Sequence, residues 1–105
     1  MQLFNTRGHK LQQFTPLQPD SIRMYSCGPT VYNHAHIGNL SSYIYADILR
    51  RTLRQCFGTT KHVMNITDVD DKTIRDSLAR YPDQPPRQAL QRLTDHYQQI
   101  FLDEM

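Results

Sequence analysis

Residues 25–39, Tyr-Ser-Cys-Gly-Pro-Thr-Val-Tyr-Asn-His-Ala-His-Ile-Gly-Asn, decide the fold because they join an alternating apolar segment to the longest helical pattern in the chain. The segment at 22–27 alternates apolar and polar residues and ends at a Gly-Pro pair, as a β-strand does when it meets a turn. Helical spacing then runs from near Gly38 to the breaker Gly58. Its apolar positions are Tyr43, Ala46, Leu49, Leu53 and Cys56.

A second strand is predicted over 61–67, where apolar and β-branched residues follow the helix. A strand, helix and strand of these lengths predict a right-handed parallel crossover, so the fold class is α/β. Upstream, two short runs at 3–6 and 11–14 flank a Gly-containing turn and predict a β-hairpin.

Two further helices are predicted downstream. Asp70 is placed to cap a short helix, because its carboxylate can accept the unpaired N–H groups of a first turn. The apolar residues of that helix are Ile74, Leu78 and Tyr81. Pro86 begins a last helix that carries Leu90, Leu93 and Tyr97.

This ending predicts an unfinished sheet. We expect the apolar face of the last helix to need a further strand, and none follows. A two-stranded parallel core is also small for independent stability. Residues 1–105 are therefore expected to be one partial nucleotide-binding domain, completed by a C-terminal part or by a complementary chain.

Length and composition set the class of protein. The 105 residues are 38% hydrophobic and 21% charged, which fits one ordered domain. A net charge of +2 names no nucleic-acid partner. The sequence shows no signal peptide and no apolar stretch that could span a membrane. Because neither segment is seen, a cytoplasmic location is expected. Two cysteines are too few for a disulfide framework.

The loop before the long helix has the features of a phosphate site. It leaves the carboxyl end of a strand and enters a helix N-terminus, where backbone N–H groups and the helix dipole attract anions. Gly38 removes an obstructing side chain, and His36 or Asn39 could donate a hydrogen bond to an oxyanion. A glycine-assisted turn with a solvated histidine is the alternative.

Cys27, His34 and His36 could be mistaken for a local zinc site. Their spacing matches no common structural zinc motif, and three ligands leave tetrahedral zinc one short. Cys27 fits better as a single ligand for a metal shared with distant residues, and a buried inert thiol is the alternative. Cys56, on the apolar stripe, is expected in the core.

Asp68, Asp70 and Asp71 allow three interpretations. They could hold Mg²⁺, because hard cations prefer oxygen ligands. A phosphoaspartyl nucleophile is a second interpretation, although Lys72 stands where that pattern has threonine. The third interpretation is structural. Asp70 caps the helix, Asp71 interacts with the positive end of the helix dipole, and Asp68 forms a hydrogen bond with the backbone of a turn.

The long helix carries basic residues that could contact RNA phosphates, although such side chains are more often the solvated face. They are Arg50, Arg51 and Arg54, with Lys61 nearby in sequence. No role is predicted for His9, His62 or His96.

Residues 25–39, followed at strand-helix-strand distance by Asn-Ile-Thr-Asp-Val-Asp-Asp-Lys at 65–72, closely resemble cysteinyl-tRNA synthetase, a class I aminoacyl-tRNA synthetase. The similarity covers essentially the whole chain, and two long motifs in the correct order are highly specific. The resemblance implies the N-terminal part of a Rossmann-like catalytic domain. It also implies ATP-dependent activation of cysteine to cysteinyl adenylate and transfer to tRNA(Cys).

In that family a His-Ile-Gly-His element and a later Lys-Met-Ser-Lys-Ser loop stabilise the phosphates of ATP, which arrives with Mg²⁺. The resemblance implies that His36, Gly38 and Asn39 bind ATP and that His36 and Asn39 are catalytic. Asn39 replaces the second histidine, which keeps a hydrogen bond and loses any cationic contribution. Leu40 and Ser41 depart from the family pattern of a small residue followed by arginine.

The family also holds a zinc ion that binds the substrate thiol, and its first ligand corresponds to Cys27. Gly28, Thr30 and Thr67 would lie near the substrate L-cysteine. The other zinc ligands and the lysine-rich loop have no counterpart in these residues, so this chain alone is expected to be inactive. Two alternatives remain: a ligase joining cysteine to an amino sugar, and a noncatalytic synthetase-like module that binds a protein or nucleotide.

Overall fold

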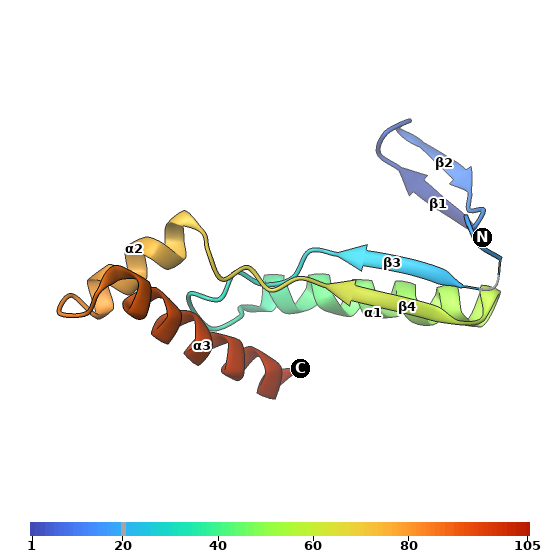
Figure 1. The fold of residues 1–105 in the computed structure, drawn as a ribbon. Coiled ribbons are helices and arrows are strands. Elements are labelled where there is room, and N and C mark those ends of the chain that lie inside the picture. Colours follow the sequence, from blue (N-terminus) through green and yellow to red (C-terminus); the bar gives the residue numbers. More distant parts are fainter. Residues whose placement is uncertain (20) are drawn as a thin grey trace.

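The computed structural model describes residues 1–19 and 21–105, which form four strands and three helices. Their order is β1 (Gln2–Asn5), β2 (Lys10–Gln13), β3 (Ile22–Ser26), α1 (Ile37–Phe57), β4 (Thr60–Met64), α2 (Asp71–Arg80) and α3 (Pro86–Glu104). Figure 1 shows the β1–β2 hairpin at one end, α1 beside β3 and β4 in the middle, and α2 with α3 at the other end. The predicted α/β content is confirmed.

The central layer is a parallel strand pair covered by one helix. In β3 and β4, Ile22 lies opposite Thr60 and Ser26 lies opposite Met64. Helix α1 joins the two strands and contacts both. The predicted order of strand, helix and parallel strand is therefore confirmed.

The two strands come together again past their ends. Thr30 and Thr67 form an isolated parallel bridge. The Val31 N–H donates to the Thr67 carbonyl at 3.0 Å, and the Thr67 N–H donates to the Pro29 carbonyl at 2.8 Å. This second bridge fixes where the loop after β3 begins.

Gly28 lies between the ladder and the bridge, close to the backbone of the neighbouring strand. A Cβ atom built there would lie 1.8 Å from the Asn65 carbonyl oxygen and 2.7 Å from Cγ of Met64. Real Cβ atoms do not approach this closely, so only glycine allows the strands to meet at this distance.

The hairpin is antiparallel, with Gln2 opposite Gln13 and Asn5 opposite Lys10. His9, for which the sequence suggested no role, has a positive φ of 47° in its turn. Immediately after β2, the Phe14 ring packs edge-on against Phe57 of α1 with their centroids 5.3 Å apart. This aromatic contact joins the hairpin side of the molecule to the end of α1.

Cys56 is exposed, so its predicted place in the core is wrong. Tyr43 and Leu53 of the predicted stripe are buried. In the last turn of α1, Phe57 takes the inward position against Phe14. The buried face of α1 thus passes through residue 57 instead of residue 56, and the Cys56 thiol faces solvent.

Asp70 caps α2 as predicted. Its Oδ1 accepts the Lys72 N–H at 2.8 Å, and the Asp70 N–H donates to Oγ1 of Thr73 at 2.8 Å. This reciprocal capping box satisfies backbone donors that the first turn cannot satisfy internally.

The buried face of α2 differs from the predicted one. Thr73 and Ser77 are buried at 0% and 1% exposure, whereas Ile74 and Leu78 are 42% and 41% exposed. Both hydroxyls donate to backbone carbonyls of α2 or its cap at 2.8 Å, so they enter the interface without unpaired polar atoms. Small residues suit this packing against α3.

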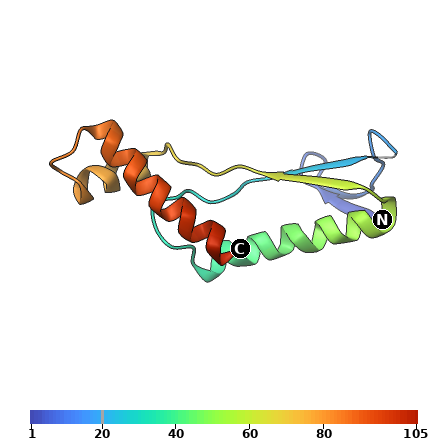
Figure 2. The ribbon, with the colours of Figure 1, turned by 60° about the horizontal axis from the view of Figure 1, so that its bottom comes forward.

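Two of the three apolar residues predicted for α3, Leu93 and Tyr97, are buried and Leu90 is half-buried, so the expectation that this face needs a following strand is wrong. Leu93 and Tyr97 are 1% and 7% exposed and form a cluster with Val31 of the loop after β3. Helix α3 covers this loop instead of a sheet. Figure 2 shows that its C-terminal end comes back to the start of α1, where Phe101 packs edge-on against Tyr43.

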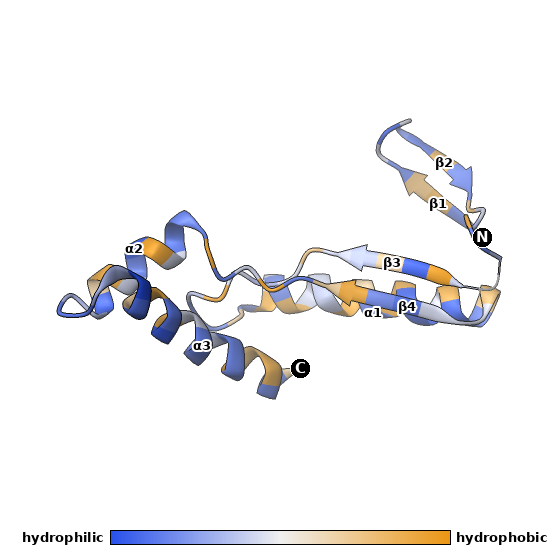
Figure 3. Cartoon of the chain, viewed as in Figure 1, coloured by the Kyte–Doolittle hydropathy of each residue, from blue (hydrophilic) through white to orange (hydrophobic). Residues whose placement is uncertain are grey.

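The molecule is elongated, with extents of 54 × 28 × 25 Å and a radius of gyration of 17.7 Å. A compact chain of this length would have a radius of gyration of about 13 Å. Tyr25 and Val63 on the sheet, and Ile44 and Ile48 on α1, are about half or more exposed. Figure 3 shows hydrophobic stretches along β3, β4 and α1. In the described ranges, no helix has both the length and the apolarity needed to cross a bilayer.

We predict that Gly28→Ala lowers the free energy of unfolding by at least about 2 kcal/mol, because a methyl group would overlap backbone atoms of the neighbouring strand. Gly8→Ala is the matched control, since the nearest atoms to its new Cβ lie at 3.6 Å. Urea denaturation of both variants measures the effect. Equal stability of the two variants would contradict the close approach.

Candidate functional site

A cavity of about 380 Å³ lies beyond the carboxyl end of β3, between the following loop, the start of α1, and α3. Four of the six residues that the resemblance assigns to ATP or to the substrate cysteine line it: Gly28, Thr30, His36 and Asn39. Its other lining residues are Pro29, Val31, Tyr32, Asn33, His34, Ala35, Tyr43, Lys72, Tyr97, Ile100 and Phe101. Cys27, Gly38 and Thr67 lie next to these residues in the chain or across the bridge, but they do not line the cavity.

His36 and Asn39 form the cap of α1. Nδ1 of His36 accepts the Gly38 N–H at 3.1 Å, and Oδ1 of Asn39 accepts the His36 N–H at 3.3 Å. Because Nδ1 is an acceptor, the neutral imidazole carries its proton on Nε2. The cap also leaves the Nδ2 amide of Asn39 unused, so each residue can cap the helix and still offer an N–H group.

Gly38 protects this geometry. A Cβ at residue 38 would lie 3.0 Å from Cε1 and 3.1 Å from Nδ1 of His36. The imidazole would then have to move away from the backbone N–H that it caps. Gly38 therefore acts on the cavity through His36.

Asn65 connects the two strand ends below the cavity, and sequence reasoning assigned it no role. Its Oδ1 accepts the Tyr25 hydroxyl at 2.9 Å and the Gly28 N–H at 3.1 Å. Its Nδ2 donates to Oγ1 of Thr67 at 3.0 Å. The sequence pattern placed Asn65 inside the predicted strand 61–67, whereas β4 ends at Met64, so Asn65 lies at the sheet edge where ligands bind.

Cys27 is exposed, which excludes a buried inert thiol. Its Sγ lies 3.8 Å from the Gly28 carbonyl oxygen, a weak contact. Within residues 1–19 and 21–105, no three His, Cys, Asp or Glu residues are grouped closely enough to hold a metal ion. Cys27, His34 and His36 therefore do not form a self-contained zinc site, and Cys27 alone would supply one of the four ligands that zinc takes.

Helix α3 supplies the wall of the cavity that the sequence did not predict. The His34 ring packs edge-on against Tyr97 at 5.5 Å between centroids, and its Nδ1 lies 3.7 Å from Oε1 of Glu104. Phe101, also of α3, packs edge-on against Tyr43 of α1. Burial, and secondly the charge of Cys27, raises the pKa of Tyr43, so this cavity phenol stays neutral at physiological pH.

The carboxylates at 68–71 are placed by α2. Asp70 accepts a backbone N–H of the first turn, and the negative charge of Asp71 in that turn interacts favourably with the positive end of the helix dipole. Asp68 is exposed. The structural interpretation holds for Asp70 and Asp71, and the described part of the chain contains no three-carboxylate cluster for Mg²⁺.

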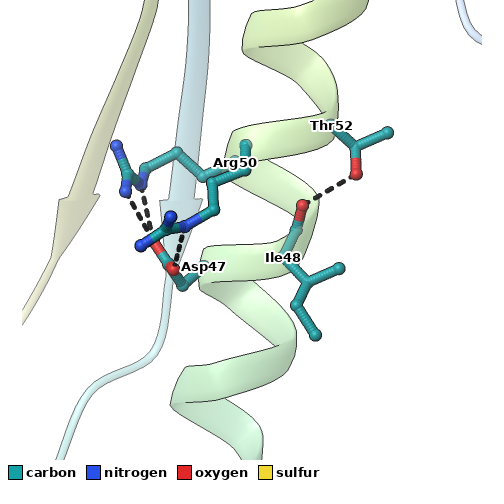
Figure 4. Close-up of polar contacts among 5 residues, drawn as sticks. Asp47, Ile48, Arg50 and Thr52 are labelled. Atoms are coloured by element: carbon teal, nitrogen blue, oxygen red, sulfur yellow. Dashed lines mark hydrogen bonds and ion pairs between the residues drawn. The ribbon is translucent and has the colours of Figure 1, made fainter.

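The basic face of α1 is partly neutralised. Asp47 forms ion pairs with Arg50 and Arg51, each with an N–O distance of 2.6 Å. Figure 4 shows Asp47 facing Arg50 on the same side of α1. Hydrogen bonds donated by Arg50, and to a smaller extent by Arg51, lower the pKa of the Asp47 carboxyl. Two of the three arginines are thus paired within the helix, which favours a solvated face over an RNA-binding one.

Two histidines without a predicted role make structural contacts. Nε2 of His62 lies 2.8 Å from the Ser26 hydroxyl, across the β3–β4 pair. The His96 ring packs edge-on against Tyr97 at 5.0 Å. Both contacts support the framework around the cavity.

Comparison with known proteins agrees with the motifs. A family model described as "tRNA synthetases class I (C) catalytic domain" matches residues 13–105. The cysteine–tRNA ligase of Solibacter usitatus is 42% identical over 104 residues, which are 99% of this chain and 21% of that protein. The cysteine–tRNA ligase of Koribacter versatilis is 46% identical over 99% of this chain and 20% of its own length.

A third relative, the cysteine–tRNA ligase of Protochlamydia amoebophila, is 51% identical over 76% of this chain and 17% of its own length. The chain thus spans about a fifth of the length of the curated relatives it matches. The family match and these identities confirm the resemblance seen in the two motifs, and the chain belongs to the cysteine–tRNA ligase family of class I tRNA synthetases.

Proposed function

We propose that this chain carries the phosphate-binding part of a cysteine–tRNA ligase that activates L-cysteine with ATP and transfers it to tRNA(Cys). The observation that carries this proposal is the capping box of His36 and Asn39 on the cavity. The names of the relatives support the substrates. A cytoplasmic location goes with this function.

His36 and Asn39 bind ATP in this proposal. The Nε2–H of His36 and the Nδ2–H of Asn39 donate to phosphate oxygens, and the N-terminus of α1 adds the positive end of its dipole. The cysteine carboxylate attacks the α-phosphorus, a new P–O bond forms, and pyrophosphate leaves with the electron pair of the broken bond. Activation therefore depends on positioning and charge stabilisation and needs no protein nucleophile. Mg²⁺ accompanies ATP.

Gly28, Thr30 and Thr67 border the place of the substrate cysteine. Cys27 supplies one thiolate ligand to a zinc ion whose other ligands are not among these residues. Bound zinc would discriminate cysteine from serine, because zinc binds a soft thiolate more strongly than an alcohol oxygen. The exposed thiol of Cys27 supports this assignment.

Residues 1–105 form part of a Rossmann-like domain in this proposal, with a right-handed crossover through α1. The parallel β3–β4 pair and the cavity at its carboxyl end support that architecture. Further residues, on the same polypeptide or on a complementary one, supply the second phosphate-binding loop.

We predict that His36→Asn separates capping from ligand binding. Asparagine caps helices well, so the free energy of unfolding should stay within about 0.5 kcal/mol of the parent, whereas His36→Ala should lose about 1 kcal/mol. Both variants lose the Nε2–H donor, and a hydrogen bond to a charged group is worth about 1.5 kcal/mol, or about tenfold in ATP affinity. Urea denaturation and ATP titration calorimetry measure the two effects.

His9→Asn is the matched control, because it makes the same exchange in the hairpin turn, where asparagine tolerates the positive φ of 47°. It should leave ATP affinity unchanged. If His36→Asn binds ATP as tightly as the parent, His36 does not contact the nucleotide.

The 105-residue chain alone should show no cysteine-dependent exchange of pyrophosphate into ATP. It offers one zinc ligand and one of the two phosphate-binding elements. A complete cysteine–tRNA ligase from a relative serves as the positive control. Measurable exchange by the chain would overturn this assignment of parts, whereas a chain that binds a protein but no ATP would favour the noncatalytic module.

A further inference from the structure

Lys72 belongs to the first turn of α2, yet it lines the same cavity as His36 and Asn39. Its Nζ lies 5.3 Å from the centroid of the Tyr32 ring, which also lines the cavity. This cation–π contact holds the ammonium group at the cavity wall. The cap of α2 uses only the backbone N–H of Lys72, so the ammonium group is available for a ligand.

The charge of the cavity wall is unbalanced. Among the described residues that line it, Lys72 alone carries a permanent charge, and none is a carboxylate. The carboxylate of Asp70 accepts the backbone N–H of Lys72 and does not line the cavity. Glu104 lies 3.7 Å from the lining residue His34 but does not line the cavity itself. An ammonium group in a concave wall that holds no carboxylate attracts anions.

The other groups offered to an anion are neutral. His36 caps α1 with an unprotonated Nδ1, and Asn39 is an amide. A polyphosphate needs cationic charge as well as hydrogen bonds, because its oxygens repel each other. The lysine side chain is long and flexible, and it can leave the weakly bound Tyr32 ring for a phosphate oxygen.

We propose that Lys72 is a further phosphate-binding residue of this cavity and supplies the positive charge that Asn39 lacks. The proposal rests on the proposed function for its ligand, a nucleoside triphosphate, and on the geometry for its charge. The ammonium group contacts the phosphates, while His36 and Asn39 donate hydrogen bonds from the start of α1.

The test compares four proteins in calorimetric titrations with ATP and with inorganic pyrophosphate. Lys72→Met should weaken both affinities by about tenfold or more, and Lys72→Arg should keep them within about threefold of the parent. Lys61→Met is the matched control, because Lys61 is an exposed lysine of β4 outside the cavity. It should bind both anions like the parent.

Salt dependence gives a second readout that a structural role would not change. Loss of one phosphate contact should make the fall of affinity with rising salt shallower in Lys72→Met than in Lys61→Met. Circular dichroism confirms the fold of each variant, and Lys72→Gln replaces Lys72→Met if the latter does not fold.

The outcomes separate the two proposals. Unchanged affinities in Lys72→Met would overturn the role of Lys72 and leave ATP binding intact. Pyrophosphate binding that needs Lys72, in a chain that does not bind ATP, would support the anion site and overturn the nucleotide assignment. No binding of either anion by the parent chain would overturn both.

Discussion

The structure depends on the close approach of two backbones at Gly28. Gly28 has no Cβ that would collide with the Asn65 carbonyl, so the strand ends can meet. The bridge from Thr30 to Thr67 forms just beyond this point. Asn65 then binds both sides of the junction through one amide. The loop that follows therefore starts from a fixed point, and the cavity forms beyond it.

The cavity has walls from parts of the chain that are distant in sequence. The cap of α1 supplies hydrogen-bond donors, α2 supplies the ammonium of Lys72, and α3 supplies aromatic packing through Tyr97 and Phe101. The buried cluster of Val31, Leu93 and Tyr97 ties the loop to α3. Burial of these side chains offsets the entropy of ordering a loop that lacks its own secondary structure.

Local patterns predicted the elements well, because strand alternation, helix spacing and caps depend on neighbours in the sequence. The cap by Asp70 and the pairing of β3 with β4 follow from such patterns. The packing of α3 on the loop, the burial of Thr73 and Ser77, and the exposure of Cys56 depend on which surfaces meet in space. For the same reason, the sequence motif was enough to assign His36 and Asn39 to the site. The roles of Asn65 and Lys72 were recognised only from their contacts in the structure.

The central claim is that neutral N–H donors at the start of α1 bind the phosphates of ATP. The most direct measurement is the ¹⁵N spectrum of the His36 ring and the Asn39 side-chain amide during an ATP titration. The account predicts that Nε2 of His36 and Nδ2 of Asn39 shift together and saturably, while Nδ1 keeps the chemical shift of an acceptor. Saturable shifts confined to the exposed face of β3 and β4, with these two side chains unchanged, would contradict it.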